Sequence, residues 1–204
     1  MFETLVAALI TGGTQLLTGV RGRWAGCGPS QAQRIYYANH SSHMDFLLLW
    51  SALPARLRER TRPVAAEDYW SEGIVRRYIG KQVFRGVFIE RVWSDRSISP
   101  IAPMIEALDR GDSLILFPEG TRGAGADLLP FKSGIFHVAR ERPAVDLVPV
   151  WMDNSYRVMP KGALFPVPLL CRVTFGAPLQ IDPDENRDAF LDRLRRHLLE
   201  LKSE

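Results

Sequence analysis

A histidine and an aspartate five positions apart, His40 and Asp45, are the side chains of this sequence best suited to acid–base chemistry. They lie between two apolar runs, residues 35–38 and 46–50. If the first run is a strand and the second opens a helix, His40 lies on the connecting turn, where rigid scaffolds present reactive groups. A carboxylate beside a histidine fixes the tautomer of the ring and stabilises its imidazolium, so the pair can act as a general base.

Two alternatives to this interpretation stay open. In a chain with four histidines and 23 acidic residues such a pair also arises by chance. His43 is a second candidate base, although its spacing of two residues from Asp45 gives poorer reach across a helix start. The elements around the pair therefore decide how it is interpreted.

Apolar strand-like runs alternate with amphipathic segments along the chain. The pattern predicts strands at 34–38, 63–66, 83–90, 113–117, 145–151 and 170–175. It predicts helices at 44–53, 68–79, 101–110, 134–140 and from 183 onward, with Asp68 as a cap and Gly111 as a C-terminal stop. We therefore expect one α/β domain over residues 24–204, with a mostly parallel or mixed central sheet flanked by helices.

Residues 1–23 are predicted to form an N-terminal amphipathic helix that associates with a membrane. Its apolar side chains follow a helical spacing: Phe2, Leu5, Val6, Leu9, Ile10, Leu16, Leu17 and Val20. The segment is too polar to cross a bilayer. Arg21, Arg23 and Trp24 follow it, and cationic and aromatic residues at a helix end suit the headgroup region. The alternative is an ordinary helix that covers the core of its own domain.

The bulk composition indicates a folded protein: 46% of its 204 residues are hydrophobic and 24% are charged. The mildly basic balance, +3 with a pI of about 9.1, suits anionic lipid or a phosphorylated substrate. A nucleic-acid partner is not expected, because basic and aromatic residues do not interleave.

Two cysteines, Cys27 and Cys171, are too few for a zinc site or a disulfide framework, and we expect neither a metal nor a bound cofactor. The start of the chain lacks the positive region of a secretory signal, so we expect a protein at the cytoplasmic face of a membrane, peripheral or monotopic.

Three polar stretches follow predicted strands: residues 39–45, 86–91 and 118–122. Because the carboxyl ends of parallel strands share one edge of a sheet, we expect these stretches to meet in one crevice. The crevice would then hold the His40 pair, the carboxylate of Glu119 and two guanidiniums, Arg91 and Arg122. A base beside arginines suits a reaction that activates a hydroxyl on an anionic substrate.

Four blocks in this order resemble the glycerolipid acyltransferases. They are Asn39-His40-x-x-x-x-Asp45, then Gly86-Val87-Phe88-Ile89-Glu90-Arg91, then Phe117-Pro118-Glu119-Gly120-Thr121-Arg122, then Val148-Pro149-Val150. The chain is most similar to the branch of the 1-acylglycerol-3-phosphate acyltransferases, and the likeness extends from about residue 30 to residue 180. Two features depart from the family pattern: Gly123 stands where serine often follows, and many relatives carry longer hydrophobic anchors.

The resemblance implies transfer of a fatty acyl chain from acyl-CoA or acyl carrier protein to the hydroxyl of a lysophospholipid, with 1-acylglycerol-3-phosphate as the first choice. His40 would take the hydroxyl proton and Asp45 would orient His40, with backbone amides of the turn holding the thioester oxyanion. The residues expected by family match to bind the acceptor are Gly86, Arg91, Glu119, Gly120, Thr121 and Arg122. Two alternatives are transfer to another lyso-lipid, such as lyso-ornithine lipid, and a non-catalytic lipid-binding module.

Overall fold

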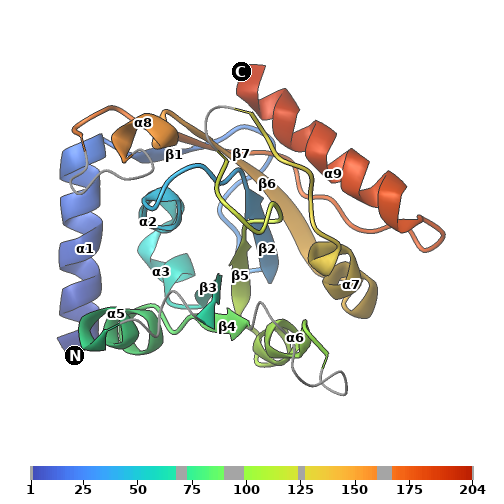
Figure 1. Cartoon of the computed structure of the whole chain (residues 1–204), viewed down its shortest axis with the longest axis horizontal. Coiled ribbons are helices and arrows are strands. Elements are labelled where there is room, and N and C mark those ends of the chain that lie inside the picture. The colour runs from blue at the N-terminus through green and yellow to red at the C-terminus, as the bar shows by residue number, and fades with distance from the viewer. Residues whose placement is uncertain (1, 68–72, 90–98, 124–126, 160–166, 204) are drawn as a thin grey trace.

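The computed structural model describes residues 2–67, 73–89, 99–123, 127–159 and 167–203 (Figure 1). Its described part contains one seven-stranded sheet in the order β1-β7-β6-β2-β5-β3-β4. The strands are β1 (Arg21–Trp24), β2 (Arg34–Ala38), β3 (Thr61–Ala66), β4 (Val87–Ile89), β5 (Ser113–Leu116), β6 (Asp146–Asp153) and β7 (Arg172–Phe175). Neighbours are parallel except at β6–β7. The expected single α/β domain with a mixed sheet is confirmed.

Helices cover both faces of the sheet (Figure 1). One face carries α1 (Phe2–Thr18), α2 (Asp45–Ala52), α3 (Ala55–Arg58), α5 (Ile74–Tyr78) and the π-helical η1 (Ile79–Val83). The other carries α6 (Ala102–Asp109), α7 (Gly134–Glu141), α9 (Arg187–Glu200) and the 3-10 turn η2 (Leu201–Ser203). The short helix α8 (Ser155–Val158) follows β6.

The central strands are buried on both sides. All five residues of β2 are buried, and they alternate between two cores: Tyr36 and Ala38 pack toward α2, whereas Ile35 and Tyr37 pack toward α6 and α9. Residues of a strand that contact apolar layers on both faces are expected to be apolar, which explains the hydrophobic run that follows Arg34 in β2. This double burial holds the carboxyl end of β2, and therefore the residues that follow it, in a fixed position.

Most predicted elements are present, but one strand begins later than expected, and β1, α3 and α8 are not predicted by the sequence pattern. The strand expected from residue 83 begins only at Val87, because Val83 belongs to a π-helical turn and Arg85 adopts a φ of 50°. The edge strand β1 was not expected, since its Arg-Gly-Arg-Trp sequence was assigned to a headgroup-binding segment. The predicted cap Asp68 lies outside the described residues.

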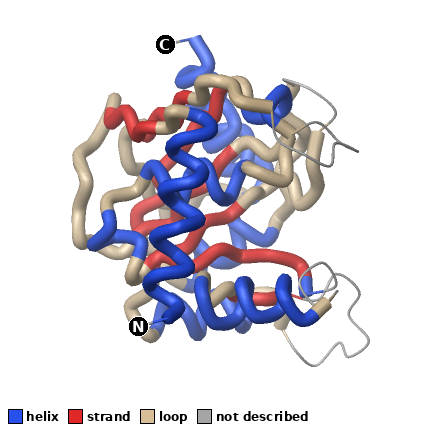
Figure 2. The backbone as a smooth tube through the Cα atoms, turned by 90° about the vertical axis from the view of Figure 1, so that its left-hand side faces the viewer, coloured by secondary structure: helices blue, strands red, loops and turns tan. Residues whose placement is uncertain are grey.

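The helix α1 lies along one side of the molecule (Figure 2), and four of its large apolar side chains are exposed. The exposed side chains are Phe2, Leu5, Leu9 and Leu16, at 64%, 57%, 67% and 91% of full exposure. Their separations of three, four and seven residues place them on one stripe. The buried side chains are Thr11, Thr14 and Thr18, whose hydroxyls each donate to the carbonyl four residues earlier. The segment thus has two faces: Phe2, Leu5, Leu9 and Leu16 form an outward stripe, whereas Ala7, Ile10 and Val20 pack against the core of the domain.

Within the described residues, no helix combines the length and the apolar character needed to cross a bilayer.

Candidate active site

The His40 ring is held by one oxygen of Asp45. Nδ1 of His40 lies 2.9 Å from Oδ2 of Asp45, and the amides of Ser41 and Ser42 donate to the same oxygen at 2.6 and 2.8 Å. The carboxylate is fully buried. Because an ionised carboxylate only accepts hydrogen bonds, Nδ1 carries the proton of the neutral ring and Nε2 keeps its lone pair. An imidazole held in this way can accept a proton at Nε2.

Local structure places both members of the pair. His40 follows the buried strand β2, and Asn39 before it bonds the backbone of Met152 in both directions, at 2.8 and 3.1 Å. These bonds tie the end of β2 to β6. Asp45 is the first residue of α2, which is anchored by buried Leu48 and Leu49. The positive end of a helix favours a carboxylate at this position.

The buried carboxylate of Glu119 holds the His40 turn through a hydrogen bond to its backbone. Its Oε1 accepts the amide of His40 at 2.6 Å and its Oε2 accepts the amide of Leu129 at 2.8 Å. The side chain is 1% exposed. Burial raises the pKa of Glu119, and the two amide donors oppose that rise. The amide of Gly123 in turn donates to the carbonyl of His40 at 2.8 Å. The expected meeting of residues 39–45 with 118–122 is thus confirmed, with Glu119 binding the backbone rather than lining a cavity.

A cavity of about 520 Å³ lies beside His40, a size typical of sites for small organic ligands. The ring of His40 stacks on Phe117 at its wall, with centroids 4.4 Å apart. Its charged and titratable lining residues are His40, His43, Arg76 and Arg122. The remaining lining is mainly apolar and includes Ile10, Phe46, Leu47, Val64, Ile79, Phe84 and Ile89. The cavity therefore combines a basic end with an apolar interior.

His43 pairs with Arg122 and not with Asp45. A guanidinium nitrogen of Arg122 is hydrogen-bonded to Nε2 of His43. Burial, followed by the positive charge of Arg122, lowers the pKa of His43. A neutral His43 can accept the Arg122 hydrogen bond at Nε2, which occupies the atom that a base would need. The geometry therefore favours His40 over His43 as a base.

Of the other residues predicted to bind the acceptor, only some lie at the cavity. Gly120 lines the cavity with a φ of +68°, and a Cβ there would lie 3.2 Å from the Lys132 side chain. Thr121 is exposed beside it. Gly86 is not among the residues that line the cavity, and its amide donates to the carbonyl of Gly80. Arg91 lies outside the described residues.

The backbone amides of the His40 turn are already engaged. The amide of His40 donates to Glu119, and those of Ser41 and Ser42 donate to Asp45. These three donors are therefore not available to a thioester oxyanion, and an oxyanion site near the turn would need other amides.

Arg76 is a cavity residue that sequence reasoning missed. It lies in α5, next to Arg77, and neither residue belongs to a recognised block. Two adjacent arginines in a helix usually mark a solvated face. Only the tertiary structure distinguishes Arg76 from Arg77. The packing of α5 and η1 places Arg76 at the cavity, whereas Arg77 is not among the lining residues.

Comparisons with known proteins agree with this geometry. The human 1-acyl-sn-glycerol-3-phosphate acyltransferase alpha is 30% identical over 178 residues, which cover 84% of this chain and 59% of the human protein. The coconut (Cocos nucifera) 1-acyl-sn-glycerol-3-phosphate acyltransferase is 28% identical over 155 residues, covering 75% and 48% of the two chains. The chain thus spans about half the length of these curated relatives.

A solved structure has the same fold: the 1-acyl-sn-glycerophosphate acyltransferase of Thermotoga maritima superposes with a TM-score of 0.74 at 24% identity, covering 99% of this chain and 82% of that one. The family model described as Acyltransferase matches residues 28–153. That range contains His40, Asp45, Glu119 and Arg122, and the chain belongs to the acyltransferase family.

Proposed function

We propose that this protein transfers a fatty acyl chain from an acyl thioester to the free hydroxyl of 1-acylglycerol-3-phosphate, producing phosphatidate. The observation that carries the proposal is the His40–Asp45 pair at the wall of a cavity with a basic end and an apolar interior. The similarity to 1-acyl-sn-glycerol-3-phosphate acyltransferases supports the choice of acceptor. The donor is acyl-CoA or acyl carrier protein.

The reaction needs one proton acceptor, and Nε2 of His40 serves as that acceptor. As the acceptor hydroxyl attacks the thioester carbonyl, Nε2 takes its proton and the new C–O bond forms. Collapse of the tetrahedral intermediate breaks the C–S bond, and the departing thiolate takes the proton from His40. Asp45 keeps the ring oriented and stabilises the imidazolium between the two steps. No acyl-enzyme forms, because the alcohol attacks the thioester directly.

The two arginines at the cavity suit the acceptor phosphate. Arg122 is oriented by its hydrogen bond to His43, and Arg76 approaches the same end from α5. Guanidinium groups form strong, directional hydrogen bonds to phosphate oxygens. The apolar lining from α2, β3 and η1 would then hold acyl chains. The cavity thus offers separate environments for the two ends of a lysophospholipid.

The membrane surface is the proposed source of the acceptor. The outward stripe of α1 is continued by Ile74 and Val75 of α5, which are 89% and 70% exposed. The aromatic rings of Phe2 and Tyr78 join these two helices. Ile10 of α1 and Ile79 of η1 line the cavity, so the helix that carries the exposed stripe also contributes to the wall of the cavity. Residues 1–23 would therefore attach the domain of residues 24–204 to a bilayer as a peripheral protein.

The test is thiol release from acyl-CoA by the purified protein in mixed micelles, with phosphatidate identified by mass spectrometry. Lysophosphatidate, lyso-ornithine lipid and a buffer blank are offered in parallel, to wild type and to His40→Ala. We expect release with lysophosphatidate only, and its loss in the variant. Release with lyso-ornithine lipid alone would reassign the acceptor. Lipid binding with no release from acyl-CoA or acyl carrier protein would show a non-catalytic lipid-binding module.

A further inference from the structure

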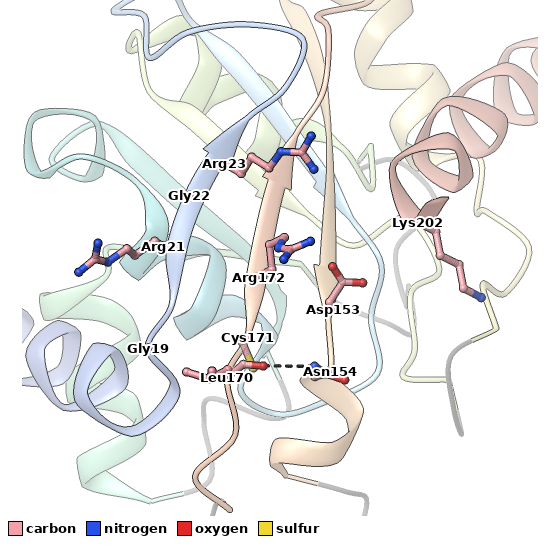
Figure 3. Close-up of a pocket in the computed structure, with 10 residues that line it drawn as sticks. All are labelled: Gly19, Arg21, Gly22, Arg23, Asp153, Asn154, Leu170, Cys171, Arg172 and Lys202. Atoms are coloured by element: carbon pink, nitrogen blue, oxygen red, sulfur yellow. Dashed lines mark hydrogen bonds between the residues drawn. The ribbon is translucent and has the colours of Figure 1, made fainter. Parts of the chain in front are cut away.

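A second cavity, of about 710 Å³, lies at the β1 edge of the sheet (Figure 3). It is separate from the cavity beside His40, and the two share no lining residue. Its lining comes from the end of α1, from β1, from β7, from the end of β6 and from η2: Gly19, Arg21, Gly22, Arg23, Asp153, Asn154, Leu170, Cys171, Arg172 and Lys202. We call this cavity the basic pocket.

Strand alternation turns the arginines of β1 away from the core. Trp24 packs inward, stacked on Phe175 with centroids 4.0 Å apart, and a Cβ at Gly22 would lie 2.9 Å from the Ala52 carbonyl oxygen. With a period of two, Arg21 and Arg23 must then face the other side. Both are exposed.

The strand register places like charges opposite each other. Arg21 of β1 pairs with Arg172 of β7, and Arg172 pairs with Asp153 of β6. Like charges directly opposite on neighbouring strands destabilise a sheet. Within the described residues no carboxylate forms an ion pair with Arg21 or Arg172. In Figure 3 the side chain of Arg21 extends away from that of Arg172. Arg21 and Arg172 therefore extend positive charge in different directions at this edge of the sheet.

Cationic side chains predominate in the lining of the basic pocket. Among its described lining residues, four are cationic, Arg21, Arg23, Arg172 and Lys202, and one carries a carboxylate, Asp153. Asp153 also accepts a hydrogen bond from the indole of Trp151 at 2.9 Å. The basic pocket therefore offers positive charge to an anionic ligand.

Exposed apolar side chains border the basic pocket. Leu170 lines it and is 78% exposed, and a Cβ at Gly19 would lie 2.7 Å from the Leu170 side chain. The amide of Cys171 donates to the carbonyl of Thr18, which ties this segment to the end of α1. Leu16, one turn before Gly19, is 91% exposed and belongs to the outward stripe of α1. A basic pocket suits the phosphate of a phospholipid, and the exposed apolar stripe beside it suits the acyl chains.

We propose that the basic pocket binds the phosphate of an anionic phospholipid in the bilayer on which α1 lies, as a lipid site separate from the acceptor cavity. The proposal builds on the membrane attachment described above. It makes the protein prefer anionic bilayers to zwitterionic ones. Arg172 and Arg21 supply the cationic groups, and Leu170 contacts the first carbons of the acyl chains.

The experiment is co-sedimentation of the full chain with vesicles of phosphatidylcholine alone or mixed with phosphatidylglycerol, which is neither the proposed acceptor nor the proposed product. The variant is Arg21→Gln with Arg172→Gln. The matched control is Arg56→Gln with Arg196→Gln, which removes the same charge from two exposed arginines outside the basic pocket. Circular dichroism confirms that both double variants are folded.

Each arginine near an anionic bilayer contributes about fivefold to binding, so we expect the basic-pocket variant to lose about thirtyfold on mixed vesicles. Its binding to phosphatidylcholine, set by α1, should be unchanged, and the control should keep its preference. Equal losses in both double variants, or no loss in either, would overturn the proposal. Weaker binding of free CoA by the basic-pocket variant, measured without vesicles, would also overturn it and assign the site to donor phosphates. No turnover is measured, so failure of the acyltransferase proposal would not produce any of these outcomes.

Discussion

His40 and Asp45 are joined through a single oxygen: Oδ2 of Asp45 lies 2.9 Å from the imidazole and accepts two backbone amides as well. The other oxygen, Oδ1, is buried and has no hydrogen-bond partner in the part of the chain that the structure describes. One oxygen thus sets the turn, the ring orientation and the tautomer together. The negative charge of the carboxylate is also close enough to stabilise a protonated His40.

Asp45→Asn tests this dependence directly. The amide keeps the shape of the side chain, and its oxygen can take the place of Oδ2 with the NH2 group at the position of Oδ1, but the negative charge that stabilises the imidazolium is lost. We expect acyl transfer to fall by about 10²–10⁴-fold, the usual contribution of general base catalysis. The measurement is phosphatidate formation under saturating substrates. His137→Ala, which alters an exposed histidine of α7, should leave the rate unchanged. A normal rate in Asp45→Asn would show that the carboxylate does not assist the base.

Glu119→Gln is expected to destabilise the fold, and more so at low pH. The glutamine has one oxygen for the two amides of His40 and Leu129, so one buried donor loses its partner at a cost of about 1–3 kcal/mol. In the folded wild type the pKa of Glu119 is above its ordinary value of 4.5. Ionisation of Glu119 therefore lowers the free energy of unfolding of the wild type as pH rises from 4.5 through that raised pKa. The variant shows no such loss, because glutamine does not ionise. The difference in free energy of unfolding between wild type and Glu119→Gln should therefore shrink as the pH increases over this range.

Urea unfolding of both proteins, below pH 4.5 and again near neutrality, measures the gap. All other carboxylates are common to the two proteins, so their titrations cancel in the difference. A gap that widens as pH rises would mean that the pKa of Glu119 is lowered in the folded state.

Arg76 and Arg77 form a matched pair for testing phosphate recognition. Only Arg76 lines the cavity, although the two are neighbours in α5. A lost charge-assisted hydrogen bond costs about 1.5–3 kcal/mol, so Arg76→Ala should lower kcat/KM for lysophosphatidate by about tenfold to a hundredfold. Arg77→Ala should have no such effect. With monoacylglycerol, which lacks the phosphate, Arg76→Ala should match wild type. A similar loss with both acceptors would argue against phosphate binding by Arg76.

Local patterns in the sequence predicted the elements that carry the His40 pair. The bounds of β2 were predicted without error, because a strand buried on both faces is continuously apolar. The contact between Glu119 and the His40 turn followed from parallel topology, since both segments leave neighbouring strands at one edge. The sequence did not predict that Glu119 would accept backbone amides, because a glutamate at this position could equally bind a ligand.

Features that depend on packing between distant elements were not predictable. Nothing in the local sequence distinguishes Arg76 from Arg77, since only the position of α5 against the sheet does so. The spacing of α1 predicted an apolar stripe but not its direction. The threonines of α1 can be buried because their hydroxyls donate to backbone carbonyls within the helix. The strand β1 did carry a signal, the alternation of arginine with inward-facing Gly22 and Trp24.

The outward direction of α1 yields a prediction about membrane attachment. Replacing Leu5 and Leu9 together by glutamine removes apolar groups that are 57% and 67% exposed in the isolated protein, so the thermal midpoint should change little. Each leucine buried in a bilayer contributes about 1.5–3 kcal/mol, so loss of both should weaken binding to phosphatidylcholine vesicles by about a hundredfold or more. Replacing Thr4 and Ala8 by glutamine is the matched control, because both are exposed on α1 but lie off the stripe. If instead the leucine variant sediments like wild type while its midpoint drops, the stripe packs against protein and not against lipid.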